Sequence, residues 1–226
     1  MMPRQLTFDL PPRPAMGRDD FFVGPANAAA VALIDRWRDW PNGKMVLTGG
    51  HGAGKTHLAH VWAAQCDARI VGARDLVDPN ALPPALVLED CEDIAGDPEA
   101  EERLFHLHNA AVAEGVPLLF TARHAPSRWG IRLPDLASRM AQSGLTHIDP
   151  PDDQLLMMVL VKQAADHGIE LTPKTLSEIT ARMPRDFGAV AELISRADDL
   201  ALSEKKPVTR AHLRAALADL PDDPSS

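Results

Sequence analysis

The stretch Gly49-Gly50-His51-Gly52-Ala53-Gly54-Lys55-Thr56 decides the fold of this 226-residue chain. It fits the pattern G-x-x-x-x-G-K-[ST], in which glycines let several backbone N–H groups point into one concavity. Lys55 supplies a mobile positive charge for the β- and γ-phosphates of a nucleotide, and the Thr56 hydroxyl is a ligand for Mg²⁺. The apolar run Met45–Thr48 precedes the loop, and we expect a helix from Lys55 to about residue 66. This strand–loop–helix context predicts a binding site for ATP or ADP with Mg²⁺.

Further apolar runs predict more strands, at Ala85–Glu89, Val116–Thr121 and Leu145–Ile148. Residues 98–115 carry apolar side chains at helical spacing, and an alanine-rich helix is expected from about residue 25 to residue 40. Helices that alternate with fully apolar strands are typical of a parallel sheet covered on both faces. The fold class predicted is therefore α/β.

After Pro150–Pro151 the pattern changes to helices alone, which predicts a small all-helical lid. Thr172 and Pro173 are suited to begin one lid helix, and Asp186 and Thr209 to cap two others. The expected organisation is an extended Pro-rich leader over 1–16, a nucleotide-binding α/β core over 17–149, the lid over 150–221 and a tail over 222–226.

Composition limits the function classes. The net charge is −9 and no strong cluster of Lys and Arg stands out, so we expect little direct DNA binding. Two cysteines are too few for a disulfide framework, and no apolar stretch reaches the roughly 18 residues of a membrane helix. The N-terminus lacks the apolar region of a signal peptide, so a cytoplasmic location is expected.

A second acidic element follows the strand Ala85–Glu89. A phosphate loop needs a carboxylate at the end of a neighbouring strand to hold Mg²⁺ through its waters, and Glu89 with Asp90 occupies that place. We expect the acids that follow to lie in a solvated loop and helix start: Glu92, Asp93, Asp97, Glu99, Glu101 and Glu102. Efficient ATPases usually place Asp first, whereas this chain has Glu first and Asp second. We therefore expect the phosphate loop to bind nucleotide, but we do not expect fast intrinsic hydrolysis.

These motifs resemble the DnaA-type AAA+ family, and more closely its short Hda-type members, which regulate inactivation of the replication initiator DnaA. The resemblance covers about residues 5–220. Beside the phosphate loop, it rests on Gln5-Leu6-Thr7-Phe8-Asp9-Leu10, on the run from Glu89 to Asp97, on Leu133-Pro134-Asp135-Leu136-Ala137-Ser138-Arg139-Met140, and on Arg185. It implies an AAA+ core with a helical lid. DnaA carries a DNA-binding domain after its lid, and we expect none here.

The resemblance also implies roles for particular residues. Arg139 matches the arginine finger, which reaches into the nucleotide of a neighbouring subunit. Arg185 matches the lid arginine that senses a phosphate, known as sensor two. Thr121 lies near the sensor-one position, although Ala122-Arg123 departs there from the more usual Ser-Asp. The segment Phe21-Phe22-Val23-Gly24, with Pro25 and Asn27, lies where related proteins hold the adenine, and Phe22 and Val23 are the residues named for that site.

The leader Gln5–Leu10 resembles the short peptide with which replication proteins engage the DNA polymerase III sliding clamp. Gln5 would be a hydrogen-bonding anchor, and Leu6, Phe8 and Leu10 would fill apolar pockets. The alternative is a tail whose apolar residues pack on the core. The clamp and DnaA are thus the expected partners, and a homodimer is possible.

Three functions fit these observations. The preferred one is a clamp-tethered regulator that offers Arg139 to ATP held by DnaA, so that DnaA hydrolyses its ATP and re-initiation is repressed. The second is an autonomous AAA+ ATPase of the clamp-loader or helicase-loader type. The third is an adaptor that attaches other factors to the clamp and affects no hydrolysis rate.

Overall fold

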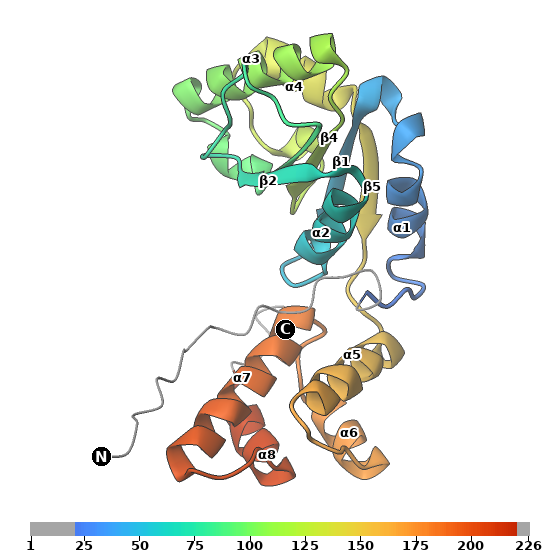
Figure 1. Ribbon diagram of the computed structural model, residues 1–226, viewed down its shortest axis with the longest axis vertical. Helices are drawn as coiled ribbons and strands as arrows, with labels where there is room; N and C mark the ends of the chain where they lie inside the picture. The colour runs from blue at the N-terminus through green and yellow to red at the C-terminus, as the bar shows by residue number, and fades with distance from the viewer. Residues whose placement is uncertain (1–20, 221–226) are drawn as a thin grey trace, which may run out of the picture.

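The computed structural model describes residues 21–220, which form an α/β core and a helical lid placed end to end (Figure 1). The core contains one five-stranded sheet in the order β2-β3-β4-β1-β5, and every neighbouring pair is parallel. The strands are β1 Lys44–Gly49, β2 Ala68–Gly72, β3 Ala85–Glu89, β4 Leu118–Ala122 and β5 Gly144–Ile148. The predicted α/β fold class is confirmed.

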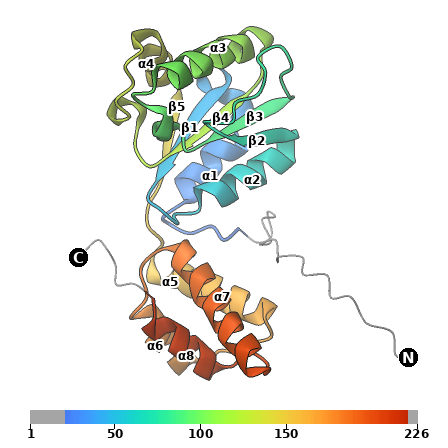
Figure 2. The same cartoon turned by 90° about the vertical axis from the view of Figure 1, so that its left-hand side faces the viewer.

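Helices cover both faces of the sheet (Figure 2). Both faces need this cover because the side chains of β1 point alternately to the two faces and are apolar on both. Met45 and Leu47 pack with Trp62 on one face, while Val46 packs with Leu104 on the other. Every residue of β1 is buried, as expected for a central parallel strand. The first face carries α1 Ala28–Asp35 and α2 Lys55–Cys66, and the second carries α3 Pro98–Glu114 and α4 Pro134–Ala141.

Two expectations about the core were wrong. Strand β2 was not predicted, because its side chains are only partly buried at the sheet edge and it lacks a continuous apolar run. The helix expected over residues 25–40 spans only Ala28–Asp35. The chain then turns so that the Trp40 ring stacks on Trp62 and its Nε1 donates to the carbonyl of Leu33 (2.8 Å). Short 3-10 turns follow α1 at Trp37–Asp39 and Pro41–Gly43, and others lie at Cys91–Ile94 and Pro126–Arg128.

The lid contains four helices around its own apolar core. They are α5 Asp153–Asp166, α6 Pro173–Thr180, α7 Phe187–Glu204 and α8 Arg210–Ala218. The predicted caps are confirmed: Thr172 accepts from the N–H of Thr175, Asp186 accepts from the N–H of Gly188, and Thr209 forms a capping box with His212. These polar side chains satisfy N–H groups that the first turn of a helix leaves without partners.

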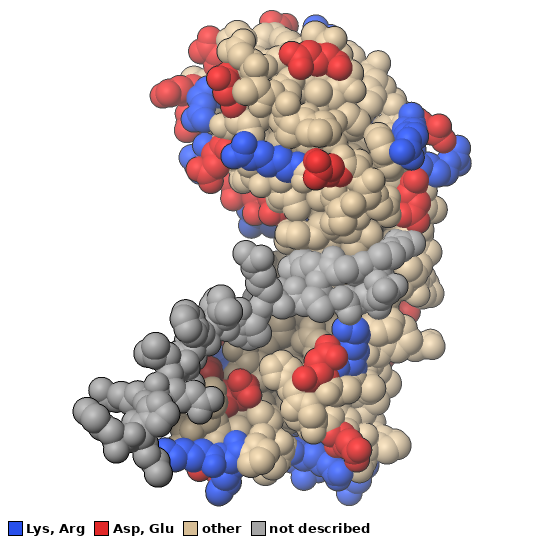
Figure 3. Space-filling view, in the orientation of Figure 1, with Lys and Arg blue, Asp and Glu red and all other residues tan. Residues whose placement is uncertain are grey.

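The surface carries charges of both signs. On the face shown in Figure 3, acidic and basic side chains are interspersed over the core and the lid. Within residues 21–220, no helix is both long and apolar enough to cross a bilayer.

A buried pair beneath α4 generates a prediction about pH. The Nζ atom of Lys44 lies 2.9 Å from Nε2 of His108, and both residues are buried. Burial, together with the charges of Lys44 and Arg139, lowers the pKa of His108 to about 4. An unperturbed histidine has a pKa near 6.5, so between pH 6.5 and pH 4 residue 108 is protonated in the unfolded chain and neutral in the folded one. The free energy of unfolding should therefore fall as the pH drops through that window.

Urea unfolding at a series of pH values from 4 to 7 measures this dependence. The variant His108→Gln should show a flatter profile than the parent, and His106→Gln, at an exposed position of the same helix, should not. Equal slopes for the parent and His108→Gln would contradict the assignment.

Candidate nucleotide-binding site

The phosphate loop connects β1 to α2, as its sequence predicts. Gly54 (φ +96°) precedes the first residue of α2, and Gly52 (φ +60°) also has left-handed backbone, which favours glycine. The loop therefore ends at the N-terminus of a twelve-residue helix, where N–H groups without partners and the helix dipole favour an anion.

Lys55 lies folded across this loop. Its ammonium donates to the carbonyl oxygens of Gly49 and Gly50, each at 2.8 Å. Burial lowers the pKa of Lys55, while the carboxylates of Asp90 and Glu92 oppose that shift. A phosphate that enters the loop would offer the ammonium charged oxygens in place of these two carbonyls.

The acidic element lies at the same edge of the sheet, because parallel strands end together. Glu89 is the last residue of β3, and its Oε1 atom is buried without a hydrogen-bond partner among the described residues. Asp90 is exposed, and its backbone N–H donates to the hydroxyl of Thr121 at 3.2 Å. A carboxylate oxygen without a partner fits a hydrated Mg²⁺, which binds oxygen ligands and keeps several waters. Thr56, at the start of α2, would be the other protein ligand.

Glu92 is not the solvated loop acid that we expected. Its side chain is only 9% exposed and is bonded to the guanidinium of Arg123 and to His124 from the end of β4. Burial raises the pKa of Glu92, but these hydrogen bonds outweigh burial and hold the pKa below its usual range. The contacts of Glu92 with Arg123 and His124 join the loop after β3 to the residues that follow β4. The Arg123 charge is close enough to Lys55 to lower the pKa of that lysine. Arg123, which departs from the usual sensor-one residue, thus has a defined partner.

The lid contacts the phosphate loop through the start of α7. The N–H of Phe187 donates to the carbonyl of Gly52 (3.0 Å), and the carboxylate of Asp186 lies 3.1 Å from Nδ1 of His51. A side chain at Gly52 would overlap this carboxylate, since an ideal Cβ there would be 1.3 Å from Oδ1 of Asp186. We predicted Asp186 only as a helix cap, and its contact with the loop joins residues 135 positions apart.

Arg185, the residue expected to act as sensor two, points elsewhere in this structure. Its guanidinium pairs with Asp153 at the start of α5 (3.0 Å), and its side chain is 63% exposed. It thus links the start of α5 to the segment that precedes α7, while its neighbour Asp186 faces the loop.

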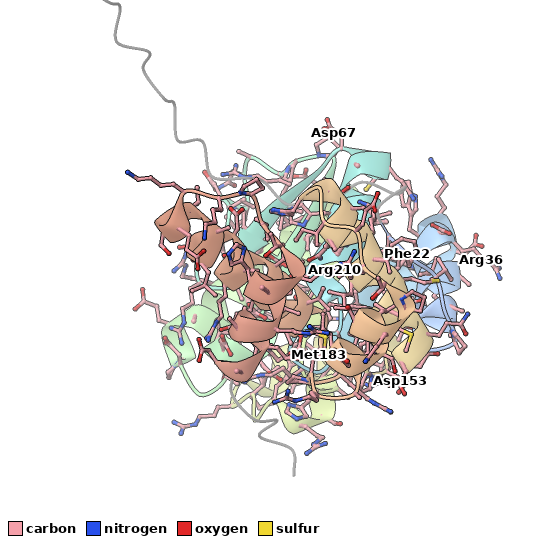
Figure 4. All side chains as sticks on the ribbon, turned by 90° about the horizontal axis from the view of Figure 1, so that it is seen from below. Phe22, Arg36, Asp67, Asp153, Met183 and Arg210 are labelled. Atoms are coloured by element: carbon pink, nitrogen blue, oxygen red, sulfur yellow. The ribbon has the colours of Figure 1, made fainter. Side chains whose placement is uncertain are left out.

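The segment before α1 lies beside the loop and the lid. The ring of Phe21 packs edge-on against His57 of α2 (5.0 Å between centroids) and, with Phe187, lies within 4 Å of an ideal Cβ at Gly54. Phe22 accepts a hydrogen bond at its carbonyl from the buried Asn27 (2.9 Å). Viewed from the lid end, Phe22 and Asp153 lie on the α5 side (Figure 4).

That this segment lies near the adenine, with Phe22 and Val23 as the named residues, stays a prediction. Within the segment, Phe21 is the residue whose ring lies closest to Gly54 of the loop. Val23 is exposed. The three-residue segment offers apolar surface beside the loop, and only its folding against α2 distinguishes which ring faces it.

Arg139 lies far from this site. The carbonyl of Arg139 bonds to Nζ of Lys44, the first residue of β1, whereas the phosphate loop follows the last. Five residue steps along a strand separate the two ends by ~17 Å. The side chain of Arg139 is exposed and forms no hydrogen bond or ion pair within residues 21–220. Arg139 is thus not part of its own chain's phosphate site.

Gln5, Leu6, Phe8 and Leu10 lie outside the described residues.

The contact between Gly52 and Asp186 predicts a specific effect on stability. In Gly52→Ala, the left-handed backbone costs about 1–2 kcal/mol, and the new Cβ must also displace the carboxylate that caps α7. The control is Gly50→Ala, where no atom lies within 4 Å and no positive φ is required.

Urea unfolding should show a loss of at least 1 kcal/mol for Gly52→Ala and a change below about 0.5 kcal/mol for the control. Adding Asp186→Ala to Gly52→Ala should relieve the overlap but not the backbone strain. Equal stability of the two glycine variants would show that the lid does not occupy this position.

Comparisons with known proteins agree with this architecture. No protein-family model matches the sequence. The chain is 27% identical to the chromosomal replication initiator DnaA of Caulobacter vibrioides, over 87% of this chain and 48% of that protein, and 26% identical to DnaA of Thermomicrobium roseum, over 89% and 49%. It thus spans about half the length of these relatives.

Among solved structures, domain III of DnaA from Thermotoga maritima superposes with a TM-score of 0.77 at 19% identity, over 93% of this chain and 98% of that one. The Holliday junction branch migration motor RuvB of the same organism gives 0.63 at 17% identity, over 87% and 69%. The chain therefore has the AAA+ fold, and its sequence is related to the AAA+ domain of DnaA proteins.

Proposed function

We propose that this chain binds ATP or ADP with Mg²⁺ at the phosphate loop and regulates the initiator DnaA. Nucleotide binding is supported by the loop at the start of α2, by Lys55, and by the Glu89 oxygen that lacks a partner among the described residues. One solved structure with the same fold is DnaA of Aquifex aeolicus bound to AMPPCP, with a TM-score of 0.67 at 15% identity over 81% of this chain and 65% of that one.

The observation that carries the regulatory proposal is the placement of Arg139. Its guanidinium is exposed, lacks an ion-pair partner among the described residues, and lies at the end of β1 opposite its own loop. A guanidinium placed this way is available to a nucleotide on another molecule. Arginine is suited to that role because its planar group stabilises spread phosphoryl charge.

In the proposed mechanism, residues 5–10 tether the chain to the DNA-loaded sliding clamp and Arg139 approaches ATP held by DnaA. DnaA then hydrolyses its ATP to ADP, and initiation is repressed. An arginine finger acting in trans increases the hydrolysis rate by about 10³–10⁵, so a poor ATPase is still a strong activator. Arg185 would sense the phosphate of this chain's own nucleotide after leaving Asp153, and Phe22 and Val23 would lie near its adenine. The reaction would take place in the cytoplasm.

The alternative is an autonomous AAA+ ATPase of the clamp-loader or helicase-loader type. The fold similarity to the RuvB motor is compatible with it. The order Glu89 then Asp90 disfavours it, because Asp90 is the shorter acid and has to reach the attacking water. Asp90 is exposed and has left-handed backbone (φ +53°).

Removing the proposed finger tests the mechanism. In a reaction with ATP-bound DnaA and clamp loaded on DNA, Arg139→Ala should reduce the stimulation of ATP turnover by at least 10²-fold, since the trans guanidinium supplies most of the effect. The control is Arg103→Ala, at an exposed position of α3. Full stimulation by Arg139→Ala would rule the mechanism out. Rapid ATP turnover by the isolated chain would instead support the alternative.

The tether is tested by clamp affinity. Gln5→Ala and Leu6→Ala remove the proposed hydrogen-bonding anchor and one apolar contact, and each should weaken clamp binding about tenfold or more in titration calorimetry. Thr7→Ala, between two of the proposed contact residues, is the control. Unchanged affinity in both anchor variants would exclude the leader from clamp binding.

A further inference from the structure

Helix α4, which carries Arg139, has only eight residues and lies on α3 through its buried side chains Leu136 and Met140. A helix this short is marginal by itself, so its position depends on tertiary contacts. Its first turn also lacks an ordinary cap, because the N-cap residue is Leu133, whose side chain accepts no hydrogen bond.

The N-cap residue itself is held by Glu101 of α3. The Glu101 carboxylate accepts hydrogen bonds from the N–H groups of Leu133 (2.7 Å), Arg132 (3.0 and 3.1 Å) and Gly96 (2.7 Å). Glu101 is completely buried, so the expectation that it is solvated was wrong. An ionised carboxylate would be costly in that position without such partners. Burial raises the pKa of Glu101, but the three backbone donors outweigh it and hold the pKa below its usual range.

The other end of α4 is held by Lys44 of β1. The Lys44 ammonium donates to the carbonyl of Arg139 (2.7 Å), and it lies 2.9 Å from Nε2 of His108. Lys44 is only 2% exposed. An ammonium only donates, so Nε2 of His108 is the acceptor and its proton is on Nδ1, which faces the side-chain oxygen of Asn109 at 3.3 Å.

The two buried charges have the signs that a helix dipole favours. An anion lies at the N-terminus of α4, where the dipole is positive, and a cation lies at the C-terminus, where it is negative. Glu101 comes from α3, a helix of 17 residues, and Lys44 from the fully buried strand β1. Both side chains bond to the backbone of the α4 segment. They fix its place without contacting the Arg139 guanidinium.

We propose that Glu101 and Lys44 are positioning residues that hold both ends of α4 and thereby orient Arg139 toward the nucleotide of a partner. This inference rests on the proposed role of Arg139 as a finger in trans. It adds that the finger acts from a rigid support, so that its efficiency depends on two residues that contact neither nucleotide nor partner.

The variants Glu101→Gln and Lys44→Met test the proposal. Each keeps the approximate size of the side chain and removes the charge, and Glu99→Gln on the exposed side of α3 is the matched control. Both positioning variants should lower the maximal stimulation of DnaA ATP turnover about five- to tenfold. The concentration of this protein that gives half-maximal stimulation should change little. Their α4 amides should also exchange with deuterium faster than those of the parent and of Glu99→Gln.

Two further measurements separate positioning from general damage. Because the phosphate loop lies ~17 Å away along β1, the affinity for ADP should stay within about twofold of the parent. In an Arg139→Ala background, neither variant should reduce stimulation further. A loss of ADP affinity equal to the loss of stimulation would show a general folding defect and overturn the proposal.

The outcomes distinguish this inference from the proposed function. If Arg139→Ala abolishes stimulation while Glu101→Gln and Lys44→Met stimulate like the parent, the positioning role is wrong and the finger remains. If Arg139→Ala stimulates like the parent, the finger role is wrong, and the positioning role is overturned with it.

Discussion

The structure depends on β1, a buried strand bonded on both sides to parallel neighbours, β4 and β5. Its carboxyl end leads into the phosphate loop, and its first residue, Lys44, holds the helix that carries Arg139. Because a paired strand is held extended, at about 3.3 Å per residue, its two ends keep a fixed separation. One central strand thus leads into the phosphate loop at one end and contacts the helix that carries Arg139 at the other.

The lid adds a second constraint at the phosphate loop. The start of α7 bonds to Gly52 and places the Asp186 carboxylate beside His51. In the proposed function, a nucleotide at the loop would bring negative charge close to this carboxylate and would so couple occupancy of the loop to the position of the lid. The Arg185–Asp153 pair lies within the lid and links the start of α5 to the segment before α7. In the proposed sensor role of Arg185, a phosphate would replace Asp153 as its partner.

Sequence alone predicted the features that rest on local patterns. The phosphate loop, the strands β3, β4 and β5 to within two residues at each end, and the caps Thr172, Asp186 and Thr209 all follow from short-range rules. The edge strand β2 was missed because it lacks a continuous apolar run. The site's non-local contacts were missed for a different reason. Residues of the types Lys and Glu are usually exposed, and only tertiary folding supplies the partners that allow the burial of Lys44, Glu92 and Glu101. Asp186 was recognised as a cap, but no local rule indicates that it faces the loop.

The proposed role of Arg139 toward a nucleotide on another molecule can be seen in a structure of this chain with DnaA that holds a non-hydrolysable ATP analogue, on clamp-loaded DNA. We expect an Arg139 guanidinium nitrogen within about 3 Å of an oxygen of the γ-phosphate bound to DnaA, with α4 still packed on α3. A complex in which Arg139 faces away from every partner phosphate would contradict that role.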